Sequence, residues 1–208
     1  MLKIAVLVSG GGSNLQAIID AKQAGKIKDG ELALVLSSSA DAYALERAAK
    51  AGIPTEVCSK KDYADRNAFT DAILNILDKY GIDLVVLAGF MYILSPEFCK
   101  AYENRVMNVH PALIPAFCGD GYYGLKVHEY VIASGVKITG ATVHFVNSIT
   151  DGGPIIAQGA VPVEFDDTPE ILQKRVMAEC EWKLLPEAVD LFCQGRLRVV
   201  GSRVEILD

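Results

Sequence analysis

Two polar side chains stand two positions apart in the stretch MNVHP at residues 107–111. Side chains alternate between the two faces of a strand, so a strand here points Asn108 and His110 in the same direction. An amide donor beside an imidazole that can carry a proton is suited to holding the negative charge that develops on a carbonyl oxygen. The alternative interpretation is a polar strand end with a surface histidine.

The sequence before this pair predicts where it lies in the fold. Residues 83–91 form a nearly unbroken apolar run, which is typical of a parallel strand buried on both faces. We expect the strand with Asn108 and His110 to be its neighbour in the sheet. Ligands of open α/β sheets bind at the carboxyl ends of parallel strands, where this pair falls.

A second candidate site lies near the start of the chain. An apolar strand at residues 4–8 precedes three glycines at residues 10–12, and a helix with Ser13 or Asn14 as its N-cap is predicted next. Unpaired N–H groups at a helix start bind anions, and glycines let a phosphate come close. Dinucleotide-binding loops carry a third glycine where Leu15 stands. We favour a monophosphate site over a purely structural turn or a dinucleotide site.

Composition bounds the class of protein. The chain has 208 residues, of which 51% are hydrophobic and 22% are charged, and we expect one soluble domain over residues 1–208. A net charge of −6 argues against a nucleic-acid partner, and no apolar stretch is long enough to cross a membrane. Five cysteines without a CxxC pair and the lack of a signal peptide predict a cytoplasmic protein with neither disulfides nor bound metal.

The order of predicted elements favours the α/β class. Helices at residues 13–19, 42–51 and 65–79 alternate with apolar strands, which predicts a Rossmann-like, mostly parallel twisted sheet with helices on both faces. A glycine-containing loop at residues 111–124, a possible flap, leads to a short helix at residues 127–134.

The C-terminal part is predicted to add a hairpin and a long helix. Strands at residues 138–146 and 155–161 flank Asp151, which on spacing alone is a turn residue, and His144 is interpreted as a hydrogen-bonded core histidine. Thr168 begins a helix that should run to about residue 192 and bend at Pro186, before a last edge strand at residues 197–200.

Four ordered segments carry a resemblance to a known family: GSNLQA at residues 12–17, LAGFM at 87–91, NVHPALIP at 108–115, and VHFV at 143–146 followed by DGGP at 151–154. Together they resemble the folate-dependent formyltransferases over roughly residues 3–195. The resemblance implies transfer of a formyl group from 10-formyltetrahydrofolate, as co-substrate, to the amine of phosphoribosylglycinamide in purine biosynthesis. No metal is implied.

The same resemblance implies catalytic roles. Asn108 and a protonated His110 would polarise the formyl carbonyl, and Asp151 would pair with His110 and relay a proton from the amine through water. Because a neighbouring carboxylate favours the imidazolium, we expect Asp151 to raise the pKa of His110.

The resemblance also implies binding residues for both substrates. The phosphate and ribose of one substrate would contact Gly12, Ser13, Asn14, Leu15, Gln16 and Glu181. The folate would contact Asn108, Met91, Tyr92, Ile93, Leu94, the loop at 146–151 and, through its glutamate carboxylate, Arg66. Tyr92 and Ala116 replace an arginine and a lysine of many relatives, and the segment at residues 117–123 is longer than usual.

Other interpretations of Arg66 and of the activity fit the same sequence. Arg66 is equally consistent with a solvated cation partnered by Asp62 or Asp65. Water in place of the amine would make the protein a formyltetrahydrofolate hydrolase, and a non-catalytic nucleotide-binding module is the alternative from another class. The partners expected are small molecules, with the chain a monomer or a weak homodimer.

Overall fold

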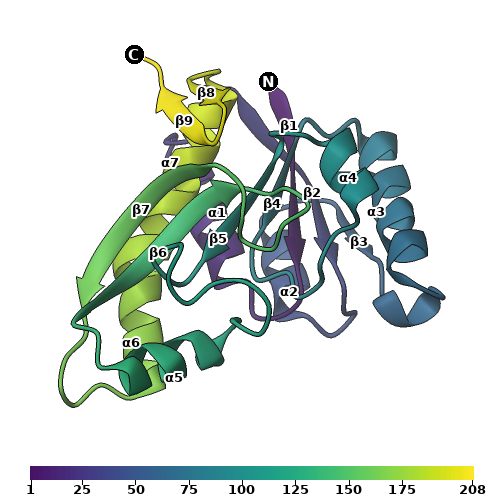
Figure 1. Cartoon of the computed structure of the whole chain (residues 1–208). Helices are drawn as coiled ribbons and strands as arrows, with labels where there is room; N and C mark the ends of the chain where they lie inside the picture. The colour runs from purple at the N-terminus through teal and green to yellow at the C-terminus, as the bar shows by residue number, and fades with distance from the viewer.

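A nine-stranded twisted sheet forms the centre of the computed structural model, which describes residues 1–208 (Figure 1). Its strand order is β3-β2-β1-β4-β5-β6-β7-β9-β8. The strands are β1 (Leu2–Val8), β2 (Gly30–Ser37), β3 (Thr55–Val57), β4 (Leu84–Leu87), β5 (Val106–His110), β6 (Ile138–Phe145), β7 (Ile155–Pro162), β8 (Leu197–Val200) and β9 (Arg203–Ile206). Strands β3, β2, β1, β4 and β5 pair in parallel, whereas β6 runs antiparallel to both β5 and β7.

Helices cover both faces of this sheet, as the element order predicts (Figure 1). They are α1 (Ser13–Gln23), α2 (Tyr43–Lys50), α3 (Arg66–Tyr80), α4 (Pro96–Ala101), α5 (Leu125–Ser134), α6 (Pro169–Val176) and α7 (Trp182–Cys193). Strand residues alternate between two hydrophobic cores, since Ile4 and Val6 pack on the side of α1, α2, α5, α6 and α7, while Ala5 and Leu7 pack on the side of α3 and α4. The predicted α/β fold is confirmed.

The strand with the candidate catalytic pair lies where the sequence predicts. β5 is the parallel neighbour of β4, and Leu87 stands opposite Asn108 in their register. The loop after β5 leads to α5, and the β6–β7 hairpin then brings the chain back beside β5.

The predicted N-cap of the first helix is wrong, and the C-terminal elements differ from their predictions in detail. Neither Ser13 nor Asn14 caps α1, because Gly12 is its N-cap in the left-handed region (φ 71°) and no side chain caps the helix. The C-terminal helix is interrupted by a π-helical turn at Met177–Glu181, while Pro186 lies within α7. The expected edge strand at residues 197–200 is confirmed as β8, the outermost strand of the sheet, and the strand β9 that follows it in the chain pairs with it.

None of the helices combines the length and the apolarity needed to span a bilayer.

Candidate active site

Neighbouring strands deliver the candidate catalytic residues to one place. Asn108 stands opposite His144 in the antiparallel register of β5 and β6, and His110 stands opposite Thr142. The turn between β6 and β7 carries Asp151, whose backbone is left-handed (φ 54°). Because that turn folds back over the end of β5, the structure brings Asn108, His110 and Asp151 together.

Both ring nitrogens of His110 have neighbours, and the residue is 4% exposed. The Nε2 atom lies 2.8 Å from the carbonyl oxygen of Phe117, and Nδ1 lies 3.5 Å from Oδ2 of Asp151. A carbonyl oxygen only accepts hydrogen bonds, so Nε2 carries the proton. A neutral His110 therefore has its lone pair on Nδ1, and the second proton of an imidazolium sits there, toward Asp151.

Asp151 acts to raise the pKa of His110, as expected, but the net shift of that pKa is downward. Burial lowers the pKa of His110 below its ordinary value, and although the Asp151 carboxylate and the Phe117 carbonyl both act to raise it, burial dominates. The imidazole is thus largely neutral at neutral pH. The neighbouring Asp151 carboxylate supplies the negative charge that favours its protonation.

Asp151 is held as a carboxylate by several partners. Burial alone would raise its pKa, but the contact with His144, the charge of His110 and the backbone N–H of Gly119 together hold the pKa of Asp151 below its ordinary value. That N–H donates to Oδ2 at 2.9 Å. The segment from Phe117 to Gly119 therefore contacts both His110 and Asp151.

His144 is a site residue that the sequence did not reveal. It is the buried, hydrogen-bonded histidine that we expected, since its Nδ1–H donates to the Phe145 carbonyl at 2.8 Å. Its Nε2 also lies 3.3 Å from Nδ2 of Asn108 and 3.6 Å from Oδ1 of Asp151. The predicted hairpin held the signal, because the β5–β6 register sets His144 opposite Asn108.

The glycine loop forms a second part of the site, between β1 and α1. A Cβ atom added to Gly12 would lie 2.7 Å from Cβ of Ala44, and its φ of +71° is unfavourable for other residues. A cavity of about 260 Å³ opens here, lined by Gly10, Gly11, Gly12, Ser13, Asn14, Arg47, Ala88 and Gly89. The backbone N–H groups that begin α1 are available to an anion in this cavity.

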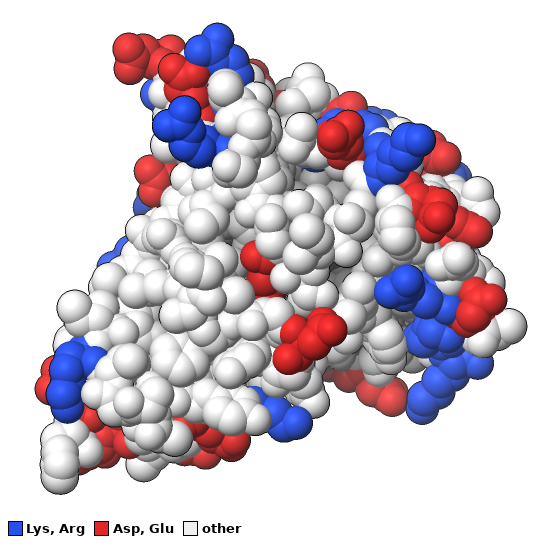
Figure 2. Space-filling view, in the orientation of Figure 1, with Lys and Arg blue, Asp and Glu red and all other residues white.

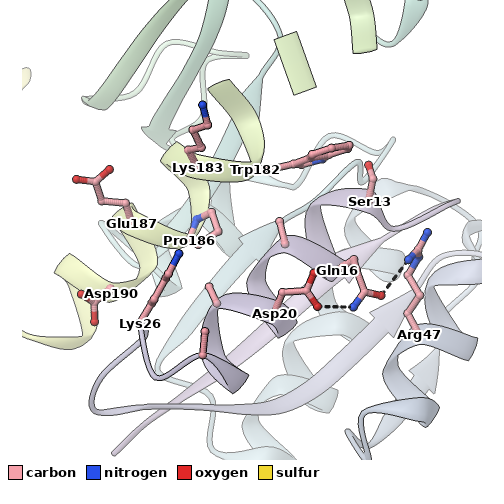
Figure 3. A pocket seen from close by; sticks show the side chains of 13 residues that line it. Ser13, Gln16, Asp20, Lys26, Arg47, Trp182, Lys183, Pro186, Glu187 and Asp190 are labelled. Carbon is pink, nitrogen blue, oxygen red and sulfur yellow. Dashed lines mark hydrogen bonds between the residues drawn. The ribbon is translucent and has the colours of Figure 1, made fainter. Parts of the chain in front are cut away.

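The remaining residues predicted for the phosphate and ribose have different surroundings. Nδ2 of Asn14 donates to Oε2 of Glu181 at 2.7 Å, and burial raises the pKa of that carboxyl although the hydrogen bond opposes it. Leu15 is fully buried, so its side chain belongs to the core. Gln16 accepts a hydrogen bond from Arg47 and donates one to Asp20 (Figure 3).

The residues predicted for the folate lie after β4 and at the start of α3. Met91, Tyr92 and Ile93 are exposed apolar side chains, whereas Leu94 is buried in the core. Arg66 is the exposed first residue of α3 and forms no ion pair with Asp62 or Asp65.

A second cavity and the distribution of surface charge also bear on the function. A cavity of about 770 Å³ lies between α1 and α7 and shares Ser13 and Arg47 with the glycine-loop cavity, but it contains none of the catalytic candidates (Figure 3). On the face seen in Figure 2, Lys and Arg side chains lie scattered near the margins, around a broad and mostly uncharged area with acidic side chains near its middle. This face offers a polyanion no continuous basic surface. No group of three or more His, Cys, Asp or Glu side chains is arranged to hold a metal ion.

Comparison with known proteins decides the family. The sequence profile described as formyl transferase matches residues 2–189. The chain belongs to the formyl transferase family. The membership that the four sequence segments indicated is thereby confirmed.

This formyl transferase is similar to several characterised proteins. It is 42% identical over 198 residues to phosphoribosylglycinamide formyltransferase of Escherichia coli strain K12, covering 95% of this chain and 90% of that protein. The crystal structure of glycinamide ribonucleotide transformylase 1 from Symbiobacterium toebii superposes with a TM-score of 0.94 at 47% identity, covering 100% of this chain and 95% of that one.

A longer relative contains the same domain. The trifunctional purine biosynthetic protein adenosine-3 of Gallus gallus is 41% identical over 198 residues, which are 95% of this formyl transferase. The chain spans only 19% of that relative's length.

Proposed function

We propose that this formyl transferase moves the formyl group of 10-formyltetrahydrofolate to the amine of phosphoribosylglycinamide, a step of purine biosynthesis. The observation that carries the proposal is the convergence of Asn108, His110 and Asp151 at the end of β5, one strand away from the glycine-loop cavity at the end of β4. Relatives named for this reaction, similar over nearly their whole length, support it.

The chemistry follows from the donors at the end of β5. The amine nitrogen attacks the formyl carbon, a C–N bond forms, and the carbonyl π electrons move to oxygen. An N–H of Asn108 donates to that oxyanion, and the positive charge of a protonated His110 stabilises it. When the carbonyl re-forms, the bond to N10 of the folate breaks and N10 takes the proton that the amine loses. One such donor contributes about 3 kcal/mol to the transition state.

Asp151 has two roles in this proposal. Its carboxylate stabilises the second proton on Nδ1 of His110, because opposite charges at about this separation attract. It also lies beside the reacting centre, where it can receive the amine proton directly or through water. His144 is a positioning residue, since its Nε2 accepts a hydrogen bond from Nδ2 of Asn108 and orients that amide.

The spacing of the strands fits the proposed substrate. The glycine loop follows β1, Asn108 lies on β5, and β4 is the only strand between them. Neighbouring strands lie about 4.8 Å apart, so a ligand joining the two sites spans roughly 10 Å. A phosphoribosyl group with a short amide arm has this length, with Gly12, Ser13 and Asn14 at its phosphate and Glu181 at its ribose hydroxyls.

The folate is proposed to lie on the other side of the reacting centre. The exposed apolar Met91 and Ile93, with Tyr92, would contact its aromatic rings, and Arg66 would pair with its glutamate carboxylate. Asn108 would then face both substrates.

A steady-state assay with 10-formyltetrahydrofolate, with and without phosphoribosylglycinamide, tests the proposal. Formyl transfer predicts turnover that requires the amine substrate. Turnover at the same rate without the amine would make the protein a hydrolase, and binding of either ligand without turnover would make it a non-catalytic module.

A further inference from the structure

We infer that Arg47 recognises the substrate phosphate and determines the preference for a phosphorylated over an unphosphorylated ribosyl amine. This inference rests on the proposed function and adds to it a residue outside the glycine loop. Arg47 belongs to α2, which the chain reaches 30 residues after the loop, and no sequence motif singled it out.

The packing of α2 against the loop places Arg47. The backbone N–H of Ala44 donates to the Gly10 carbonyl at 3.0 Å, and Ala44 is the residue that leaves no room for a side chain at Gly12. Residues three apart on a helix share a face. Arg47 therefore follows Ala44 along the face of α2 that touches the glycine loop.

Several contacts fix the guanidinium before any ligand binds. Nε donates to the Gly11 carbonyl at 2.8 Å, and Nη1 donates to Oε1 of Gln16 at 2.9 Å (Figure 3). The group also stacks over the ring of Tyr43, 4.9 Å from its centroid. Arginine has five N–H donors, so the two hydrogen bonds leave three for a ligand.

The lining of the glycine-loop cavity makes Arg47 the natural counter-ion. Of its eight residues, Arg47 alone is charged. A phosphate monoester carries a charge of about −1.5 to −2 at neutral pH. The N–H groups of α1 supply partial charges only, whereas a guanidinium supplies a full charge and a fork of donors that matches phosphate oxygens.

The test compares two substrates in Arg47→Met. We measure kcat/KM for phosphoribosylglycinamide and for the same compound without its phosphate, and take their ratio. Loss of a charged hydrogen-bond partner is expected to lower this ratio by about 10- to 100-fold. Arg47→Lys keeps the charge and should recover part of the preference.

Lys50→Met is the matched control. Lys50 lies on the same helix and over the same Tyr43 ring, 5.5 Å from its centroid, but its partner is Glu46 and it does not line the cavity. Its loss removes the same net charge and should leave the ratio unchanged. An equal fall of this kcat/KM ratio in Arg47→Met and Lys50→Met would overturn the inference, because the effect would then come from the net charge of the protein and not from a contact with the phosphate.

A purely structural Arg47 gives a different result. If it only holds the loop, Arg47→Met slows both substrates alike, the ratio stays at the wild-type value, and the inference fails while the proposed function stands. Calorimetry with ribose 5-phosphate provides a readout that needs no formyl transfer. We expect binding to Arg47→Met to weaken about 10- to 100-fold, and equal affinity for both proteins would overturn the inference even if no formyl transfer is detected.

Discussion

The Nε2 atom of His110 donates to the carbonyl oxygen of Phe117 at 2.8 Å, seven residues along the chain. This contact fixes the tautomer of the buried imidazole and turns Nδ1 toward Asp151. The backbone of the loop after β5 thus decides which nitrogen is free to take up a proton during the reaction.

Removing the imidazole tests its proposed role in stabilising the oxyanion. His110→Ala should lower kcat for formyl transfer by about 10²- to 10³-fold, because the positive charge that stabilises the oxyanion is lost. KM for phosphoribosylglycinamide should change little, since the phosphate is bound at the glycine loop. Steady-state kinetics with a thermal unfolding curve check this, and a folded variant that keeps most of its kcat would refute the role.

The Asp151 carboxylate is expected to act through the pKa of His110. Burial already lowers that pKa and Asp151 opposes the effect, so Asp151→Asn should lower the His110 pKa further. A smaller fraction of imidazolium is then present at any given pH, and the limb of the pH–rate profile that reports it should move to lower pH. NMR titration of the imidazole measures the pKa directly.

A neighbouring carboxylate provides the control for this variant. Asp120 accepts a hydrogen bond from Thr150 at 3.0 Å and is exposed. Asp120→Asn should leave the His110 titration in place. An unchanged or raised His110 pKa in Asp151→Asn would contradict the assignment.

The glycine loop should not tolerate a side chain at Gly12. Gly12→Ala forces an unfavourable φ and a 2.7 Å approach to Ala44, so the loop must shift and KM for phosphoribosylglycinamide should rise. Gly25→Ala is a matched control, because Gly25 has the same φ of +71° with open space around its Cβ position. Both variants should lose about 1–2 kcal/mol of stability from the backbone strain, but only Gly12→Ala should change KM.

His128 predicts a specific acid sensitivity. It is fully buried with both ring nitrogens unpaired, and burial, with a smaller effect of His110, lowers its pKa to about 4. The unfolded chain, with a histidine pKa near 6.5, binds the proton more tightly, so stability rises with pH between about 4 and 6.5 and is lost as the pH falls through this range. The resulting destabilisation is about 2 kcal/mol at pH 5.

His128→Leu should remove this part of the pH dependence, because leucine does not titrate and its apolar side chain suits the core. Urea unfolding at pH 7.5 and pH 5 measures the free energy of unfolding for both proteins. The stability of the variant relative to the wild type should be higher at pH 5 than at pH 7.5. If the free energies of unfolding of the two proteins differ by the same amount at pH 7.5 and at pH 5, His128 does not titrate on unfolding.

Local patterns account for what the sequence predicted correctly. The alternation of a strand puts Asn108 and His110 on one face, and the glycine spacing marks the turn into α1. Both features depend on residues close together in the chain. The hairpin was predicted for the same reason, although its turn residue Asp151 needed the family resemblance to be seen as a site residue.

Long-range contacts account for what was missed. His144 joins the site through the β5–β6 register, and Arg47 reaches the glycine loop through the packing of α2. Asn14 lies inside α1, and its side chain donates to Glu181, 167 residues away. The pKa of His110 depends on a balance between burial and a neighbouring charge, which only the packed structure settles.

The antiparallel return of β6 along β5 has a consequence for how such a protein diverges. Asn108 and His144 are held by strand pairing and Asp151 by the turn that follows, so residues 120–137, which come after the Phe117–Gly119 segment that contacts His110 and Asp151, do not set the placement of these groups. Insertions or deletions in that stretch can alter which molecules gain entry while leaving the chemical step intact. Substrate access and the chemical step can therefore change independently during evolution.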